Sequence, residues 1–356
     1  AKYHRASIEA LLRGERVSPV YIDMALTKKC SYDCIYCFSH KAQRNITRDL
    51  SYKVIMDFLD DCRDIGVKAI SFVSDGESTC NKHLYNAILK CKENNIDCSL
   101  GTNGYLLKRD RLEEILKILV YLRFNISGVD RYAKIHGCKD NCYEIVIGTI
   151  QECVRIKHEN NLPVTIGLQM VLMPEIADQV IPLSQLAKQL KVDYLIIKHC
   201  TDNEKGDLHV DYEQIQALTP LLKEAEARST EQTKIVIKWS KINTGNKRKY
   251  KACWAGALIH QISGNGICSV CGSFFGKGYE KYQYGNINDM RYKDIVNSQE
   301  YWNVIEHLRS DNFNAKNECS TLCLHDKINE FIYDLQNGIT QFDDNIGELP
   351  YGGNFL

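Results

Sequence analysis

The chain has 356 residues, of which 16 are cysteines, and its 45 basic residues balance its 45 acidic residues. This balance excludes the strong overall electrostatic field that draws proteins to nucleic acid or to an anionic membrane, so we expect neither partner. The length allows one large domain and a smaller one.

The chain contains no apolar run of the length that a signal peptide or a membrane-spanning helix needs, so we expect a cytoplasmic protein. The cytoplasm keeps thiols reduced, and a chain of this length does not need disulfides to fold. Clustered cysteines therefore indicate metal binding, and the balanced overall charge favours a small or locally recognised substrate.

Short β-branched runs alternate with longer amphipathic stretches over the first two hundred residues, which predicts parallel strands covered by helices. Strands are expected at residues 21–27, 69–74, 97–103, 121–127, 164–172 and 192–200. Helices are expected near residues 51–64, 82–94, 109–119, 142–159 and 177–190. Right-handed crossovers would curl these units into an open α/β barrel whose reaction face lies at the carboxyl ends of the strands.

The alternation stops after about residue 205. A charged helical stretch at 212–229 and one further strand at 234–240 then lead to a polar segment near residue 245. Beyond it we expect a hairpin-like segment and a helix over 291–310. The predicted parts are a lead-in (1–20), a barrel (21–245), a smaller α+β domain (246–336) and a C-terminal tail (337–356).

Three cysteines follow the first predicted strand in the stretch "CSYDCIYC": Cys30, Cys34 and Cys37. A short loop with this spacing can place three thiolates on three corners of an iron–sulfur cube and leave the fourth iron open. An open coordination position distinguishes a reactive metal centre from a closed structural one. The alternative, a partial zinc site, would need a fourth ligand.

This motif, with Tyr36 before the third cysteine, resembles the signature of the radical SAM superfamily. The resemblance implies a partial (β/α)6 barrel, S-adenosylmethionine bound to a [4Fe–4S] cluster on the three cysteines, and a flavodoxin- or ferredoxin-type reductant. It further implies that the cofactor is cleaved to a 5′-deoxyadenosyl radical, which abstracts hydrogen from a C–H bond. Tyr36 would lie beside the cofactor.

Further pieces of that signature follow the next strands. "SDGEST" resembles the family's Gly-Gly-Glu segment, with Asp75 in place of the first glycine and with Gly76 and Glu77 matching. By the same resemblance, Asn103 in "GTNG" and Ser127 in "FNIS" would face the methionine and ribose of the cofactor.

Two residues of "GVDRYAKIHG", Arg131 and His136, could also belong to the cofactor site. The ordinary interpretation, surface or helix-start residues, stays open for both.

Five cysteines lie in the second part of the chain: Cys253, Cys268, Cys271, Cys319 and Cys323. Four thiolates complete a cube without an open position, as in electron-transfer or structural clusters. The pattern resembles the twitch or SPASM-like extension of radical SAM enzymes, with one auxiliary [4Fe–4S] cluster. The stretch "NGICSVCG" favours Cys271 as the ligand and keeps Cys268 in reserve. A single zinc ion is the alternative.

Cys200 and Lys198, at the end of the sixth predicted strand, are the candidate catalytic residues. A thiol there could return hydrogen to a substrate radical, as an epimerase requires. In a dehydrogenase, the substrate radical would instead lose an electron to the auxiliary cluster while a nearby base takes the hydroxyl proton. We expect dehydrogenation of a small polyhydroxylated substrate: a sugar, an aminocyclitol or a sugar nucleotide. Epimerisation and a peptide-modifying maturase are the alternatives, and a module that only senses redox state or iron would not need the cofactor motifs.

Overall fold

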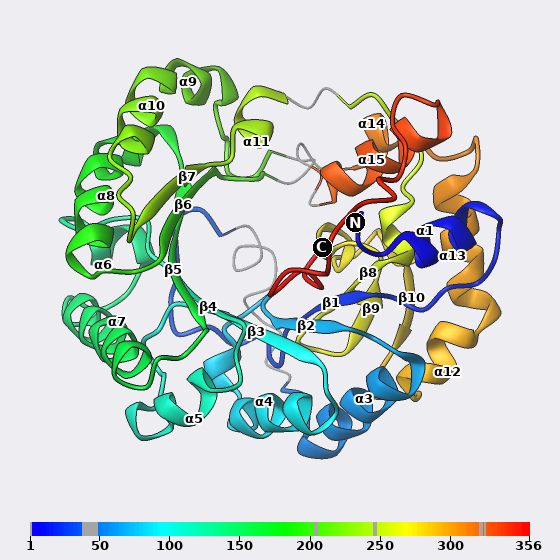
Figure 1. Cartoon of the computed structure of the whole chain (residues 1–356), viewed down its shortest axis with the longest axis horizontal. Coiled ribbons are helices and arrows are strands. Elements are labelled where there is room, and N and C mark those ends of the chain that lie inside the picture. The colour runs from blue at the N-terminus through cyan, green and yellow to red at the C-terminus, as the bar shows by residue number, and fades with distance from the viewer. Residues whose placement is uncertain (1, 38–48, 203–205, 245–247, 320–322, 324) are drawn as a thin grey trace.

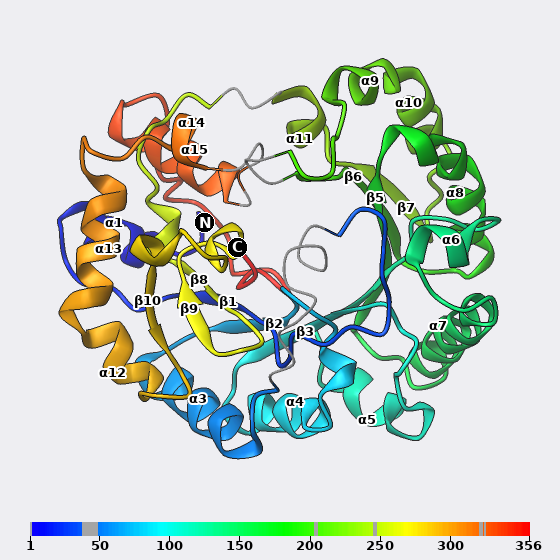
Figure 2. The same ribbon diagram turned by 180° about the vertical axis from the view of Figure 1, so that it is seen from behind.

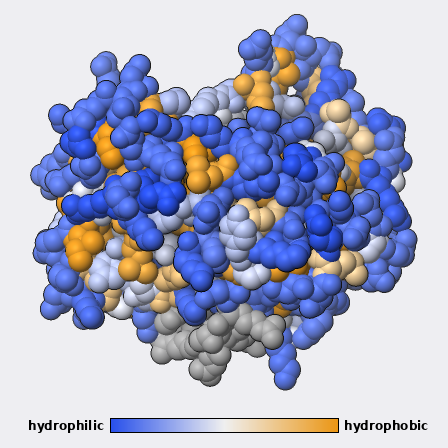
Figure 3. All heavy atoms as spheres, turned by 90° about the horizontal axis from the view of Figure 1, so that it is seen from below, coloured by the Kyte–Doolittle hydropathy of each residue, from blue (hydrophilic) through white to orange (hydrophobic). Residues whose placement is uncertain are grey.

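The strands of the protein curve around a central space and the helices lie outside them, as the computed structural model shows from both sides (Figure 1 and Figure 2). The structure describes residues 2–37, 49–202, 206–244, 248–319, 323 and 325–356. Within those ranges, no helix has the length and apolar composition that crossing a membrane requires. The face seen in Figure 3 is largely hydrophilic, with hydrophobic residues in small separate groups.

Ten strands in the described residues form one sheet in the order β10-β9-β8-β1-β2-β3-β4-β5-β6-β7. The parallel strands of the barrel wall are β1 (Tyr21–Met24), β2 (Ala69–Phe72), β3 (Asp97–Thr102), β4 (Tyr121–Asn125), β5 (Thr165–Leu172), β6 (Tyr194–His199) and β7 (Lys234–Ile237). The predicted open α/β barrel is therefore confirmed. The further strand predicted after residue 230 is β7, which extends the wall beyond the sixth strand.

Helices cover the outer face of this wall: α3 (Tyr52–Ile65), α4 (Leu84–Glu93), α5 (Leu112–Leu116), α7 (Cys142–Glu159) and α8 (Val180–Gln189). They correspond to the predicted helices, although 3-10 segments, Arg109–Arg111 and Pro174–Gln179, precede α5 and α8 and delay their starts. Shorter helices complete this part: α1 (Arg5–Leu12), α6 (Tyr132–His136), α9 (Tyr212–Ala217), α10 (Thr219–Ala227) and α11 (Trp239–Thr244).

Helix α3 illustrates how local sequence sets the ends and the buried face of an element. The Ser51 hydroxyl caps its start by accepting a hydrogen bond from the Val54 N–H at 3.3 Å. Gly66, at φ 86°, ends it in the left-handed conformation that glycine adopts readily. Ile55 and Phe58, one turn apart, are buried against the sheet.

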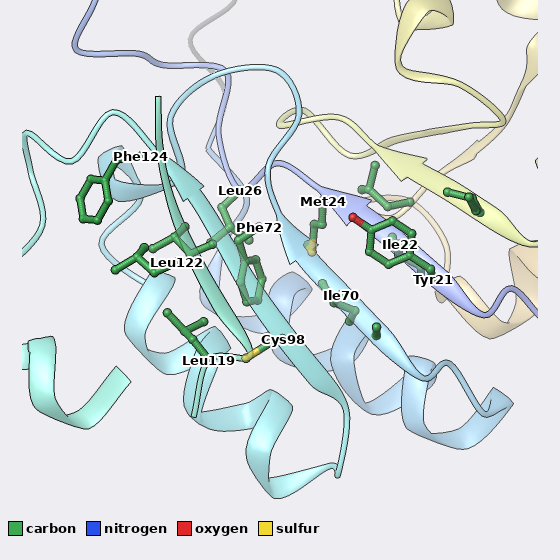
Figure 4. Packing of buried hydrophobic residues seen from close by; sticks show 14 of the residues in the cluster. Tyr21, Ile22, Met24, Leu26, Ile70, Phe72, Cys98, Leu119, Leu122 and Phe124 are labelled. Atoms are coloured by element: carbon green, nitrogen blue, oxygen red, sulfur yellow. The ribbon is translucent and has the colours of Figure 1, made fainter. Parts of the chain in front are cut away.

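Side chains alternate between the two faces of the barrel wall, as the pleat of a strand requires. Ile22 and Ile70 pair in register on β1 and β2 and are fully buried in the apolar core (Figure 4). The neighbouring pair in the same register, Asp23 and Ser71, is polar. The Ser71 hydroxyl continues this polar row, since it lies 2.8 Å from the Tyr121 hydroxyl on β4. The outer layer is thus apolar and the barrel interior is polar.

The C-terminal strands continue the same sheet. Strand β8 (Ile259–Ile262) pairs in parallel with β1, and β9 (Ile267–Ser269) and β10 (Gln283–Asn286) follow as antiparallel strands. The remaining helices are α12 (Tyr292–Asn297), α13 (Gln299–Arg309), α14 (Ala315–Glu318) and α15 (Asp326–Gln336). Strands from both sides of the predicted limit near residue 245 belong to one sheet, so the sheet does not mark a boundary between two domains. The domain limits stay a prediction.

Two predicted helices are divided in the structure. The helix expected over 291–310 breaks at Ser298, which is extended (φ −70°, ψ 156°) and whose hydroxyl caps α13 by accepting from the Tyr301 N–H at 3.2 Å. The helix expected over 212–229 breaks at Leu218, and Pro220 lies in the first turn of the new helix, where its missing N–H is tolerated.

The C-terminal tail enters the middle of the ring (Figure 1). The Phe355 ring lies 5.5 Å from the ring of Tyr21 and 5.0 Å from that of Tyr121, both in edge-to-face geometry. These tyrosines begin β1 and β4. The tail therefore packs at the amino ends of the strands, opposite the predicted reaction face.

Candidate functional site

The loop after β1 carries the first three cysteines and runs across the ring toward β5 and β6 (Figure 2). Cys30, Cys34 and Cys37 are partly buried and free of disulfides. Burial raises the pKa of Cys30 to about 12, so that a neutral thiol is favoured unless a positive metal centre stabilises the thiolate. Backbone bonds fix the loop, since Asp33 N–H donates to the His136 carbonyl at 3.1 Å.

His136 is a site residue whose role the sequence left open. It is fully buried at the end of α6, and burial lowers its pKa to about 3. Its Nε2 accepts a hydrogen bond from the Ser127 N–H at 3.0 Å, which leaves the proton of the neutral ring on Nδ1. Nδ1 lies 3.2 Å from the Tyr36 hydroxyl and 3.5 Å from Cys34 Sγ. His136 thus presents a donor to a cysteine of the loop.

The other residue left open by the sequence, Arg131, lies at the surface. It forms an ion pair with Asp178 and donates to the Glu175 carbonyl. Its side chain therefore contributes to the exterior and not to the loop of cysteines.

Gly76 and Glu77 follow β2 and bring "SDGEST" against the cysteine loop. A Cβ at Gly76, which has φ 93°, would lie 2.1 Å from the Thr27 carbonyl oxygen, so a larger residue does not fit. Glu77 is buried, and its Oε2 accepts from the Asn103 N–H at 2.7 Å while its Oε1 accepts from the Thr102 hydroxyl at 2.7 Å. Burial raises the pKa of this carboxyl.

Asn103 connects Glu77 to the cysteine loop, because its Nδ2 donates to the Ser31 hydroxyl at 2.9 Å. The structure therefore brings together Glu77, Asn103 and the loop. Ser127 lies nearby, but its hydroxyl accepts from the Val171 N–H at 3.0 Å and so joins β4 to β5.

Asp75 has a different setting from its neighbour Glu77. Its Oδ2 accepts from the Ser263 hydroxyl at 2.6 Å and lies 3.2 Å from Lys28 Nζ, and its Oδ1 accepts from the Gly264 N–H at 2.9 Å. The Lys28 and Asp75 side chains are 2% and 4% exposed. Asp75 therefore links the strand ends of the barrel to the β8–β9 turn, and its described contacts do not include Glu77.

A cavity of about 440 Å³ opens inside the barrel beside the cysteine loop. Its lining includes Tyr36 and Cys37 from that loop, the strand residues Asp23, Arg123 and Lys198, Gln261 and Ser273 from the C-terminal part, and Phe355 from the tail. The cavity thus joins the cysteine loop to polar side chains of the barrel interior.

The two candidate catalytic residues differ in their position relative to this cavity. Lys198 lines it, and burial, followed by the nearby cations Lys241 and Arg123, places the pKa of Lys198 well below its ordinary value. Cys200 is buried, and its Sγ donates to the Tyr36 carbonyl at 3.5 Å. Because Cys200 is absent from the described lining, the geometry favours Lys198 for contact with a substrate.

A second cavity, in the C-terminal part, is surrounded by four of the five cysteines there: Cys253, Cys271, Cys319 and Cys323. Cys268 is not in its lining and lies buried within β9, with its Sγ 3.8 Å from the Gly266 carbonyl oxygen. His325 also lines the cavity, and its buried Nε2 has no hydrogen-bond partner among the described residues.

The four thiols surround the cavity without converging on a point. Among the described residues, no three cysteine, histidine or carboxylate side chains approach closely enough to hold a single metal ion. A four-iron cube separates its thiolates by the width of the cluster, whereas zinc draws them to one centre. The arrangement therefore fits a cluster better than the zinc alternative.

Asn329 lies beside these cysteines and is 1% exposed. Its Oδ1 accepts from the backbone N–H groups of Trp254 at 2.8 Å and Ala255 at 2.9 Å, which fixes the orientation of the amide. Its Nδ2 then lies 3.5 Å from Cys253 Sγ and 3.8 Å from Cys323 Sγ. Such N–H donors stabilise negative charge on metal-bound sulfur.

Comparison with known proteins matches two parts of the chain to family models. Residues 24–185 match the radical SAM superfamily, and residues 253–324 match the SPASM iron–sulfur cluster-binding domain. The first match contains the cysteine loop and the second contains the four-cysteine cavity.

Individual proteins are similar to the chain at low to moderate identity. The tungsten-containing aldehyde ferredoxin oxidoreductase cofactor-modifying protein of Pyrococcus furiosus is 21% identical over 303 residues, which are 79% of this chain and 82% of that protein. A GTP 3′,8-cyclase of Campylobacter fetus is 31% identical over 114 residues, 30% of this chain and 34% of that protein.

Solved structures share the fold. Streptococcus suis SuiB bound to S-adenosylmethionine has a TM-score of 0.67 and 18% identity, over 89% of this chain and 75% of that one; SuiB has also been solved with its precursor peptide SuiA. The structure of anSMEcpe with bound AdoMet has a TM-score of 0.60 and 15% identity, over 90% of this chain and 99% of that one.

The four-cysteine cavity predicts a contrast between two neighbouring cysteines. Cys271→Ala should lower the iron bound by anaerobically reconstituted protein below about eight atoms, because one of two four-iron clusters loses one of its four ligands and becomes less stable. Cys268→Ala, which removes a buried thiol outside the cavity, should keep about eight. Iron and sulfide analysis of both purified variants measures this, and the reverse pattern would make Cys268 the ligand.

The orientation of the Asn329 amide predicts a change in reduction potential. Asn329→Asp keeps an oxygen for the two backbone donors but replaces the N–H donor by a negative oxygen, so the C-terminal cluster should become harder to reduce. We expect about a tenfold smaller equilibrium constant for reduction, or about 59 mV for one electron.

The potential is measured by a redox titration followed by electron paramagnetic resonance in the Cys30/Cys34/Cys37→Ala background, where one cluster remains. Asn317→Asp, on the exposed face of α14, is the control for added charge. An Asn329→Asp potential equal to that of the control would contradict the assignment.

Proposed function

We propose, from the premise that this chain belongs to the radical SAM superfamily and carries a C-terminal SPASM domain, that it abstracts hydrogen from a C–H bond of a small polar substrate held in the barrel cavity. The cofactors of such an enzyme are S-adenosylmethionine and [4Fe–4S] clusters. The observation that carries the proposal is the cavity of about 440 Å³, which the cysteine loop and polar strand residues line together.

Cys30, Cys34 and Cys37 are the proposed ligands of the cluster that binds S-adenosylmethionine. When bound there, the cofactor supplies a carbon-centred radical that removes a hydrogen atom from an unactivated C–H bond. Glu77 is the proposed partner of the cofactor's ammonium group. Its Oε2 accepts one described hydrogen bond, which leaves capacity for a charged donor. A flavodoxin- or ferredoxin-type protein is the proposed reductant.

The residues around the cavity support a small substrate. Its volume falls in the range of ordinary small-molecule sites. Hydroxyl, amide, carboxylate and cationic groups line it, as binding of a polyhydroxylated molecule requires. Peptide modification is the second candidate, because SuiB and anSMEcpe, which share the fold, have been solved with peptides.

We favour dehydrogenation over epimerisation. Ser273 lines both the barrel cavity and the four-cysteine cavity, so the proposed auxiliary cluster would border the substrate. An electron-accepting centre next to the substrate favours oxidation of the substrate radical over return of a hydrogen atom to it. Lys198, which lines the cavity, is the proposed catalytic contact with the substrate in this reaction. Cys200 is the proposed hydrogen donor in the alternative reaction.

Removal of the three loop thiols tests the function directly. The triple change Cys30/Cys34/Cys37→Ala should leave about half of the iron and abolish reductive cleavage of S-adenosylmethionine, because the remaining cluster has no open iron. Liquid chromatography of methionine and 5′-deoxyadenosine after anaerobic incubation with dithionite measures the cleavage. Cys98→Ala, which removes a buried thiol from β3, is the control. Cleavage by the triple variant would overturn the assignment.

The choice between dehydrogenation and epimerisation is tested in heavy water with candidate sugars and aminocyclitols. We expect the oxidised product to carry no solvent deuterium at the attacked carbon, and we expect Cys200→Ala to change turnover by less than about threefold, since Cys200 lies outside the cavity lining. Mass spectrometry of the products measures both. Deuterium that appears with the wild-type enzyme and disappears with Cys200→Ala would instead establish Cys200 as the hydrogen donor.

A further inference from the structure

Two basic side chains reach the barrel cavity from strands of its wall: Arg123 from β4 and Lys198 from β6. Neither makes a hydrogen bond or an ion pair with any residue that the structure describes, and Nε of Arg123 is buried without a hydrogen-bond partner there. The contact of Arg123 is a cation–π interaction, with its guanidinium carbon 5.7 Å from the centre of the Tyr121 ring. Charges held inside a protein are normally paired, because removing them from water is unfavourable.

The carboxylates that line the same cavity are occupied by other groups. Asp23 accepts hydrogen bonds from the Tyr21 hydroxyl and from Gln261 Nε2, the latter at 2.7 Å. It forms no ion pair with the two basic side chains in the described part of the chain. Asp75 is bound by Lys28. The carboxylates of the described lining therefore leave Arg123 and Lys198 without an ion pair.

We propose that Arg123 and Lys198 bind an anionic group of the substrate, a carboxylate or a phosphate, inside the barrel. The inference rests on the proposed function and names the class of molecule on which that function acts. The planar guanidinium of Arg123 can donate two parallel hydrogen bonds to either anion. An anion beside Lys198 would also favour its ammonium form, against the effect of burial.

The strand registers give the bound molecule a direction. Arg123 pairs in register with Gly167 on β5, and Gly167 pairs in register with Tyr194 on β6. Lys198 lies four residues further along β6, toward the carboxyl ends of the strands and the cysteine loop. A molecule whose anion lies between Arg123 and Lys198 therefore has its remaining part directed toward Tyr36 and Cys37, which line the cavity at the cysteine loop.

The test uses reconstituted protein with S-adenosylmethionine bound. Its thermal unfolding midpoint is measured in sodium phosphate, sodium acetate and sodium chloride at equal ionic strength. A bound anion stabilises the folded state in proportion to its occupancy, so phosphate or acetate should raise the midpoint above that in chloride. In Arg123→Gln, the concentration that gives half of this rise should increase by about tenfold, since a charge-assisted contact is lost.

Lys198→Gln provides an independent variant in case Arg123→Gln does not fold, and iron content reports folding for both. Arg228→Gln is the control, because Arg228 pairs with Glu224 on the outer surface of α10. Its response should match the wild type. A rise with acetate alone indicates a carboxylate, a rise with phosphate alone indicates a phosphate group, and either supports the proposal.

Two results would overturn the proposal: no rise over chloride with either anion, or a wild-type response in both Arg123→Gln and Lys198→Gln. Cleavage of S-adenosylmethionine is measured on the same wild-type samples. Intact cleavage without an anion response removes this inference and leaves the proposed function, whereas absent cleavage removes the proposed function itself.

Discussion

The buried ion pair between Asp75 and Lys28 connects the parts on which the site depends. Lys28 belongs to the cysteine loop, Asp75 to the segment after β2, and their partners Ser263 and Gly264 to the β8–β9 turn. A buried pair is favourable when further hydrogen bonds satisfy it, and Asp75 has two. A Cβ at Gly264 would lie 2.1 Å from the Thr27 carbonyl carbon, so the turn approaches the loop at backbone distance. These contacts fix the cysteine loop relative to the β8–β9 turn of the C-terminal part.

Local patterns in the sequence predicted most of the fold. Alternating β-branched and amphipathic runs located the barrel strands and their covering helices, because these periodicities follow from each element alone. The divisions at Ser298 and Pro220 depend on single capping residues within otherwise helical patterns, and a pattern averaged over a window hides them. The parallel pairing of β8 with β1 joins segments more than two hundred residues apart, and no local signal specifies such a partner.

For the candidate site too, the sequence predicted the residues that form a local motif and missed those that depend on contacts between distant segments. The first three cysteines predicted a metal centre from sequence alone, because they are close together in the chain and form a recognisable motif. The sequence did not reveal the settings of His136, Asn329 and Arg123. Ser127 sets the tautomer of His136, and two backbone donors set the Asn329 amide. Arg123 lies in a cavity where its buried Nε has no hydrogen-bond partner among the described residues. The alternation of "YLRFN" does place Arg123 on the barrel side, between the buried Leu122 and Phe124. That was the one sequence signal that could have found it.

Ser273 lines both cavities, and their closeness has a thermodynamic consequence. A negative group bound in the barrel cavity opposes the arrival of an electron in the neighbouring four-cysteine cavity, since like charges repel, most strongly where the dielectric constant is low. Linkage makes the effect reciprocal: if occupancy of the barrel lowers the reduction potential of the neighbouring centre, reduction of that centre must weaken occupancy by the same free energy. Oxidation of a bound molecule would then promote its own release, and the electron left behind would favour an empty barrel until it is passed on.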